Sequence, residues 1–226
     1  MTKKISQPRN AKARTCGLIS MLVLMAASVT AQTANHPSNQ SPSGKDKDRM
    51  HEMAKKGGGH FMFRYRPSRA RTFANLTELA ARSDVIVIGR TLTHHPMLTA
   101  GGNMIINDFV VRIQEVFKGK IPNGTSIVVS VPGGAYKFPD GTRAAVIAQG
   151  YREPQDRQMY AFFLKRHANS KQYRLISEAQ GLFALTSSGV EPADLEGSDP
   201  VVVNYRGKSS SDFLNGLHQA VQKPKK

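Results

Sequence analysis

The sequence Val85-Ile86-Val87-Ile88-Gly89-Arg90 decides the fold of this chain. Four consecutive β-branched residues favour a strand over a helix. The glycine that follows them within the same predicted strand indicates a bend or a bulge, which a tightly curled sheet needs. We therefore expect a strand that continues towards Thr93 and belongs to a strongly curved sheet.

Several other short strands are predicted downstream. The segment Phe109–Phe117 alternates apolar and polar residues, and a change of phase at Glu115 indicates a β-bulge. Further predicted strands cover residues 125–131, 144–148, 159–164, 173–176, 182–185 and 201–203, with 173–176 and 182–185 paired as a meander. Short strands with little helix between them predict a mainly β fold, either an antiparallel barrel or a sandwich.

Two helices flank the predicted strands. Asn75 can cap a short helix, because Glu78 follows it at the spacing of a capping box. The serines at 209–211 can cap a C-terminal helix. Each helix has an apolar stripe, made of Leu76, Leu79 and Ala80 in the first and of Phe213, Leu214, Leu217 and Val221 in the second.

The chain begins with the pattern of a secretory signal peptide. Residues 1–31 combine a basic start, an apolar run from Cys16 to Val29 and small residues that end at Ala31. The apolar run is shorter than the roughly 18 residues of a membrane span. We expect an extracytoplasmic protein, periplasmic or secreted, with no transmembrane segment after cleavage. Removal of Cys16 with the leader leaves no thiol or disulfide chemistry.

The rest of the chain divides by composition into three parts. Residues 32–60 are polar, rich in Ser, Gly and Lys, and predict a disordered linker. Residues 61–205 form the predicted β-barrel domain. Residues 206–226 form a basic C-terminal helix and tail. We expect a core that still folds when 32–71 and 206–226 are removed.

The positive charge is concentrated in two arms around a nearly neutral body. The chain carries a formal charge of +16. After the leader, most of the excess lies in residues 43–71 and 206–226, and such arms attract polyanions or a membrane surface. Alternating aromatic and cationic residues in Phe61–Arg71 suit phosphate or carboxylate groups. The predicted anion-binding residues are Arg64, Arg66, Arg69, Arg71, Lys223, Lys225 and Lys226.

The segment Ser83–Arg90 also carries a resemblance to a protein family. Together with Val111–Gly119, Val131–Gly134, Tyr160–Leu164 and Gln180–Phe183, it is similar to a bacterial secreted domain of unknown function. That family resembles small oligonucleotide-binding-like (OB-like) barrels, the shape shared by netrin-like modules and tissue inhibitors of metalloproteinases. The resemblance implies an OB-like fold. Tissue inhibitors of metalloproteinases act through an N-terminal cysteine. Residues 32–226 contain no cysteine, so inhibition by that route is excluded.

The candidates for chemistry are few. His94 and His95 could bind a metal ion from a loop, with Asp108 as a third ligand, but solvated loop histidines are the favoured interpretation. The carboxylates Glu153 and Asp156 are interpreted as solvated loop charges. We predict no catalytic residue and no cofactor.

These patterns favour a non-enzymatic binding module at the bacterial envelope. Loops at residues 93–107 and 133–158 would contact a protein or a glycan, and the basic arms would add attraction to an acidic envelope polymer or lipid. The predicted export argues against nucleic acid as the partner. Two alternatives are a protease inhibitor or accessory subunit that acts through barrel loops, and an enzyme with a site assembled from scattered loop residues.

The signal peptide gives a direct prediction. Amino-terminal sequencing of the exported protein is expected to start at Gln32, because signal peptidase cleaves after small residues such as Ala31. An exported protein that retains residues 1–31 would contradict this assignment.

Overall fold

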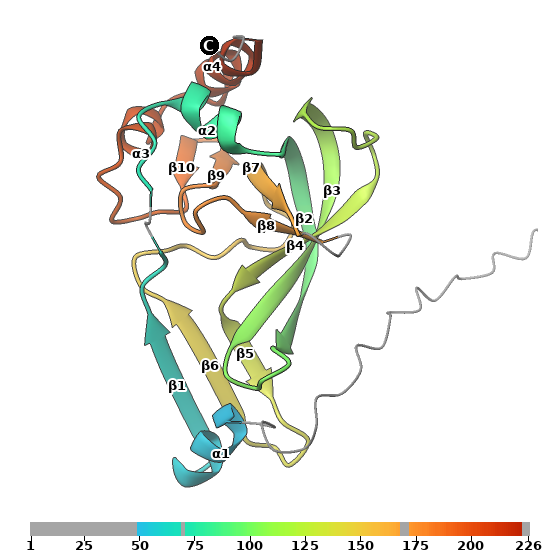
Figure 1. The fold of residues 1–226 in the computed structure, drawn as a ribbon, viewed down its shortest axis with the longest axis vertical. Helices are drawn as coiled ribbons and strands as arrows, with labels where there is room; N and C mark the ends of the chain where they lie inside the picture. The colour runs from blue at the N-terminus through green and yellow to red at the C-terminus, as the bar shows by residue number, and fades with distance from the viewer. Residues whose placement is uncertain (1–48, 69–70, 168–171, 223–226) are drawn as a thin grey trace, which may run out of the picture. The chain divides into compact units, whose positions relative to one another are not determined.

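A seven-stranded sheet and a separate three-stranded sheet form the β part of the protein (Figure 1). The computed structural model describes residues 49–68, 71–167 and 172–222, which all belong to one compact unit. The elements of this part are, in chain order, α1 (Arg49–Lys56), β1 (His60–Tyr65), α2 (Leu76–Arg82), β2 (Val85–Leu98), β3 (Ile105–Lys118), β4 (Ser126–Pro132), β5 (Gly134–Lys137), β6 (Arg143–Ala148), β7 (Met159–Arg166), β8 (Gln172–Leu175), β9 (Leu182–Thr186), β10 (Gly189–Pro192), α3 (Pro200–Tyr205) and α4 (Ser210–Gln222).

The larger sheet closes partly into a ring. Its strand order is β10-β9-β7-β2-β3-β4-β8, and β8 also pairs with β7. One edge of β7 is shared, because Tyr160–Phe162 pair with β9 whereas Leu164–Arg166 pair with β8. All ladders of this sheet are antiparallel except β4–β8. The predicted fold class is therefore confirmed as a mainly β, small, largely antiparallel, OB-like barrel with N- and C-terminal helices.

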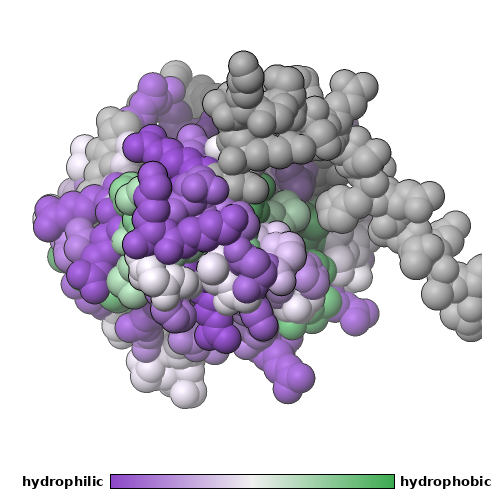
Figure 2. Space-filling model, turned by 90° about the horizontal axis from the view of Figure 1, so that it is seen from below, coloured by the Kyte–Doolittle hydropathy of each residue, from purple (hydrophilic) through white to green (hydrophobic). Residues whose placement is uncertain are grey.

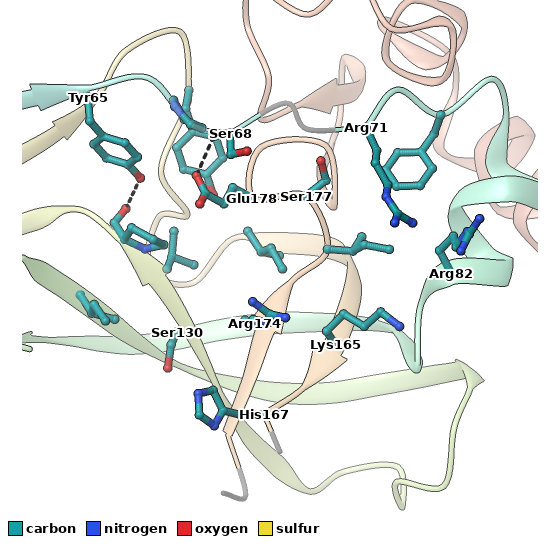
Figure 3. A pocket seen from close by; sticks show the side chains of 18 residues that line it. Tyr65, Ser68, Arg71, Arg82, Ser130, Lys165, His167, Arg174, Ser177 and Glu178 are labelled. Carbon is teal, nitrogen blue, oxygen red and sulfur yellow. Dashed lines mark hydrogen bonds between the residues drawn. The ribbon is translucent and has the colours of Figure 1, made fainter. Parts of the chain in front are cut away.

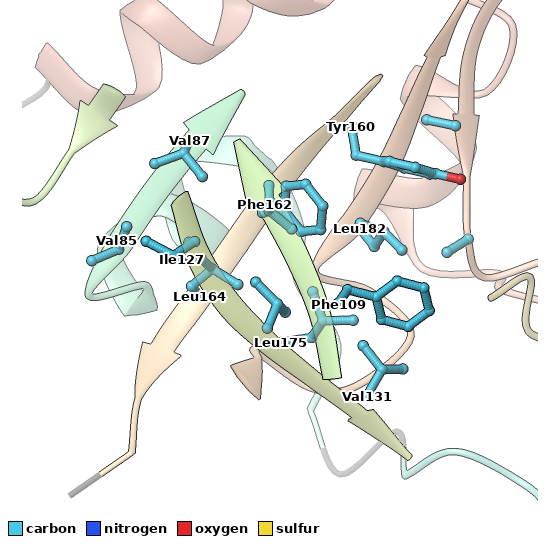
Figure 4. Packing of buried hydrophobic residues seen from close by; sticks show 14 of the residues in the cluster. Val85, Val87, Phe109, Ile127, Val131, Tyr160, Phe162, Leu164, Leu175 and Leu182 are labelled. Atoms are coloured by element: carbon cyan, nitrogen blue, oxygen red, sulfur yellow. The ribbon is translucent and has the colours of Figure 1, made fainter. Parts of the chain in front are cut away.

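The β-branched run forms the first part of β2, and this part is buried on both faces. Val85 and Val87 point into the ring, where they pack with the interior side chains of β7 (Figure 4). Ile86 and Ile88 point to the opposite face and pack under the helices. Because both faces of this first part are buried, its residues are continuously apolar, whereas the rest of β2 from Arg90 onward is mostly exposed and includes polar residues.

Gly89 allows β2 to bend at the predicted place. The β2–β3 register shifts between Ile88 and Gly89. A Cβ atom on Gly89 would lie 2.5 Å from Cγ1 of Val111 on the neighbouring strand, so no larger residue fits without a shift. The close approach confirms the expected irregularity.

Helices α2, α3 and α4 cover the outer face of the sheet near β7, β9 and β10 (Figure 1). Asn75 caps α2 by accepting a hydrogen bond from the Glu78 amide at 3.0 Å. Ser209 does the same for the Asp212 amide at the start of α4, at 3.1 Å. Both predicted helices are confirmed. None of the helices in the described ranges has the length and apolarity that crossing a bilayer requires.

The smaller sheet and helix α1 correct two predictions. Its order is β1-β6-β5, with β1 parallel to β6. Residues 133–158 are thus not only a loop, since β5 and β6 lie within them. The predicted disordered linker at residues 32–60 is wrong for residues 49–56, which form α1 with Met50 and Ala54 buried. The polar composition of this segment gave no sign that Met50 and Ala54 are buried. Residues 32–48 lie outside the described ranges.

Two predictions about the later strands are also wrong. Residues 201–203 are helical, because Pro200 favours a helix start and the amides of Val202 and Val203 donate to the Asp199 carbonyl. Strands β8 and β9 exist but do not pair with each other. Each pairs with a different half of β7.

We predicted that the protein still folds without residues 32–71 and 206–226. The second of these segments includes α4, which contributes to the hydrophobic core. Phe213 and Leu217 of α4 are fully buried and pack with Phe183 and the outer face of the sheet. The C-terminal helix is therefore part of the hydrophobic core rather than a dispensable arm.

Replacement of Phe213 tests this role. Phe213→Ala is expected to lower the free energy of unfolding by about 3–5 kcal/mol, because it removes a fully buried ring. Val203→Ala, at a site on α3 that is 54% exposed, is the control and should change it by less than about 0.5 kcal/mol. Urea unfolding curves measure the free energy of unfolding of both variants. A loss for Phe213→Ala as small as that for Val203→Ala would show that α4 does not stabilise the core.

Candidate functional site

A cleft of about 600 Å³ opens beside the closed part of the ring. Its walls come from the segment after β1, from β4 and β8, and from the turn that follows β8 (Figure 3). The lining residues are Tyr65, Pro67, Ser68, Arg71, Phe73, Arg82, Ile106, Ser130, Val131, Pro132, Tyr151, Lys165, His167, Arg174, Leu175, Ile176, Ser177 and Glu178.

Cations outnumber carboxylates in this lining. Four permanent cations, Arg71, Arg82, Lys165 and Arg174, line the cleft together with His167, against the single carboxylate of Glu178. Figure 3 shows Arg71, Arg82 and Lys165 gathered at the end of the cleft opposite Tyr65. The cleft is therefore an electropositive surface.

Most of these cations lack an acidic partner. Lys165 Nζ lies 2.9 Å from Asp84 Oδ1. Arg71, Arg82 and Arg174 have no ion pair or side-chain hydrogen bond within the described ranges. Lys165 and Arg174 are directly opposite each other on the β7–β8 ladder, and like charges in such positions repel. A bound anion would relieve this repulsion.

The turn after β8 holds one wall of the cleft in place. Ser177 and Glu178 have φ angles of 49° and 43°, in the left-handed region that non-glycine residues seldom adopt. The Glu178 carboxylate accepts a hydrogen bond from the Ser68 amide at 3.0 Å. This contact fixes the segment after β1 to the barrel, and backbone strain of this kind is often found at binding sites.

Two tyrosines supply hydroxyl groups at the other end of the cleft. Tyr65 Oη donates to the Pro132 carbonyl at 3.1 Å. The Tyr151 hydroxyl is buried and has no hydrogen-bond partner within the described part of the chain. Burial, reinforced by nearby carboxylates, raises the pKa of both phenols, so both remain protonated donors at neutral pH.

The structure brings one of the predicted anion-binding residues into the cleft. Arg71 lines it, whereas Arg64 and Arg66 are exposed and do not. Arg69, Lys223, Lys225 and Lys226 lie outside the described residues.

Sequence reasoning missed Arg82, Lys165, His167 and Arg174. They lie far apart along the chain and meet because β7 pairs with β8 and α2 ends beside them. The available signal was the alternation of Leu164 with Lys165 and of Tyr173 with Arg174. That alternation indicates outward cations only once the β7–β8 pairing is known.

The predicted metal ligands do not assemble into a site. His94 and His95 lie on β2 rather than in a loop, and adjacent strand residues point to opposite faces. The Asp108 carboxylate accepts hydrogen bonds from Ser130 Oγ at 2.6 Å and Gln172 Nε2 at 3.0 Å. Within the described ranges, no three His, Cys, Asp or Glu side chains are placed to hold a metal ion.

The interpretation of Glu153 as a solvated loop charge is wrong. Glu153 is half-buried, its Oε2 lies 3.5 Å from Asn107 Nδ2, and burial raises its pKa above the ordinary value. Gly134 is required beside this pair, because its φ is +108° and a Cβ there would lie 2.4 Å from Asn107 Nδ2. Asp156 is exposed and its Oδ1 lies 3.0 Å from His94 Nδ1.

The fold and the cleft define a small, mainly β protein with an OB-like ring and a cationic cleft beside it. A scan against protein-family models and a search of curated proteins both return no match for this chain. The function of the protein therefore has to be inferred from the geometry of the cleft.

The raised pKa of Glu153 predicts a pH-dependent effect. The folded state favours the protonated carboxyl, so the stability from this group is present at acid pH and lost as pH rises through the folded pKa. Glu153→Gln should therefore raise Tm relative to the unaltered protein at pH 7 and much less at pH 4. Thermal unfolding at the two pH values measures the difference, with the exposed Glu52→Gln as control. A rise in Tm for Glu153→Gln that is the same at both pH values would contradict the raised pKa of Glu153.

Proposed function

We propose that this protein is an exported, non-enzymatic binding module that holds an anionic ligand of the bacterial envelope in the cationic cleft. The observation that carries the proposal is the group of three arginines, Arg71, Arg82 and Arg174, that line one cleft without acidic partners in the described ranges. Arginine binds phosphate and carboxylate through two parallel hydrogen bonds, which suits it to this task.

The form of the cleft supports a ligand rather than a solvated surface. Its volume of about 600 Å³ is within the range of small-molecule sites. Apolar side chains such as Ile106, Leu175 and Ile176 line it alongside the cations. Small-molecule sites commonly combine apolar walls with a few well-placed polar groups.

The place of action follows from the predicted signal peptide at residues 1–31. Outside the cytoplasm, the anions available to such a cleft include acidic glycans and lipid headgroups. Arg64 and Arg66 are exposed and lie outside the cleft, and they would add a weaker attraction to the same surfaces. Salt would screen this attraction.

Retention on immobilised heparin, a polyanionic probe, tests the proposal. We expect the double variant Arg71→Gln, Arg174→Gln to bind heparin at least about tenfold more weakly, because each charge-assisted hydrogen bond contributes about 1.5–3 kcal/mol. The variant should elute at lower salt than the unaltered protein.

The matched control is Arg64→Gln, Arg66→Gln, which removes the same charge from exposed arginines outside the cleft. It should lower the elution salt only slightly. Equal shifts for the two double variants would mean that binding follows total charge, and the cleft would not be the site.

A further inference from the structure

A second cleft adjoins the first one at Arg82 and Lys165. It measures about 570 Å³ and lies where the end of α2, the end of β3 and the end of β7 meet. Arg82 and Lys165 line both clefts, so the two clefts are adjacent and share these two side chains. A ligand could therefore extend from one cleft into the other.

The lining of the second cleft is mostly polar. Its cations are Arg82, Lys118, Lys120, Lys165 and Arg166, and its single carboxylate is that of Asp84. Asp84 is engaged by Lys165 Nζ and by the Arg166 amide at 3.1 Å. Lys118 Nζ donates to the Ala80 carbonyl at 2.7 Å.

Three cations in this second cleft are left for a ligand. The side chains of Arg82, Lys120 and Arg166 make no ion pair or hydrogen bond within the described ranges. Three unpaired cations at one place match a group with more than one negative charge better than a single carboxylate.

The first cleft differs because apolar side chains line it as well. Ile106 and Pro132 are half-buried there, and Val131, Leu175 and Ile176 contribute further apolar surface. Of the aromatic side chains in the lining, Phe73 and Tyr151 are buried and Tyr65 is half-buried. With His167 as the one exposed ring of the described lining, the cleft has no row of exposed rings on which successive bases could stack. Single-stranded nucleic acid generally relies on such stacking.

We propose that the ligand is an anionic amphiphile whose headgroup carries at least two negative charges. The headgroup lies at Arg82 and Lys165 and reaches Lys120 and Arg166, and the apolar chain lies along Ile106 and Leu175 in the first cleft. This inference rests on the proposed function and specifies its ligand class.

Isothermal titration calorimetry with three soluble probes tests the ligand class. Dihexanoyl phosphatidate has both a charged headgroup and apolar chains, glycerol 3-phosphate lacks the chains, and dihexanoyl phosphatidylcholine lacks the net charge. We expect phosphatidate to bind at least about tenfold more tightly than either of the others, a difference of about 1.4 kcal/mol.

Other rankings would overturn the inference. Equal affinity for glycerol 3-phosphate would show a site for free anions, and equal affinity for phosphatidylcholine would show a purely apolar site. Tighter binding of an acidic, leucine-containing peptide than of phosphatidate would indicate a protein partner. Cleft-dependent heparin binding without a preference for phosphatidate would overturn this inference and leave the proposed function standing.

Variants separate the two ends of the ligand. Lys120→Gln, Arg166→Gln should weaken phosphatidate, a phosphomonoester of about two charges, several-fold more than dihexanoyl phosphatidylglycerol, which carries one. Arg64→Gln, Arg66→Gln is the charge-matched control and should leave both affinities unchanged. An unchanged affinity for phosphatidate would place the headgroup outside the second cleft, and equal losses for the two lipids would show that this cleft does not bind the second charge.

The apolar end is tested at a half-buried position. Ile106→Thr should reduce the advantage of phosphatidate over glycerol 3-phosphate, whereas Ile147→Thr, on β6 and outside the cleft, should not. Unchanged Tm values would show that both variants fold. If a folded Ile106→Thr variant keeps the full preference for phosphatidate over glycerol 3-phosphate, the apolar chain of the ligand does not lie in the first cleft.

Discussion

Burial of both faces of Val85–Ile88 in β2 and of Tyr160–Leu164 in β7 is the constraint on which the rest of the structure depends. Val87 and Phe162 fill the ring, while Ile86 and Phe163 fill the layer between the sheet and the helices. Each strand therefore belongs to two cores at once, which fixes its register, because a shift by one residue would exchange the two sets of side chains. The ends of β7 and α2, fixed in this way, present Lys165 and Arg82 to the two clefts.

The parts that could be predicted from the sequence are those with strong local signals. The β-branched run, Gly89 and the cap at Asn75 act over a few residues, and all three predictions are confirmed. The failures came where tertiary contacts outweigh local preference. The valines at 201–203 are β-branched yet helical, because Pro200 favours a helix start and the helix buries Val201 and Val202 against the sheet.

The candidate site was largely beyond sequence reasoning for the same physical reason. Charge density along the chain pointed to the arms, yet Arg64 and Arg66 are simply exposed. The cations of the cleft are spread from Arg71 to Arg174, and each is unremarkable in its own segment. Ring closure through β8 concentrates them, and strand pairing between distant segments has no local signature.

The parallel pairing of β1 with β6 has a consequence for how the chain acquires its structure. His60 is opposite Arg143, so the earliest strand of the described chain cannot be completed until a much later segment is available. Pairing over such a separation requires closing a long loop, which costs entropy and slows folding. A polypeptide made from its amino terminus would leave β1 unpaired until β6 has been made. Until that pairing forms, β1 has unpaired backbone groups that can pair with another chain.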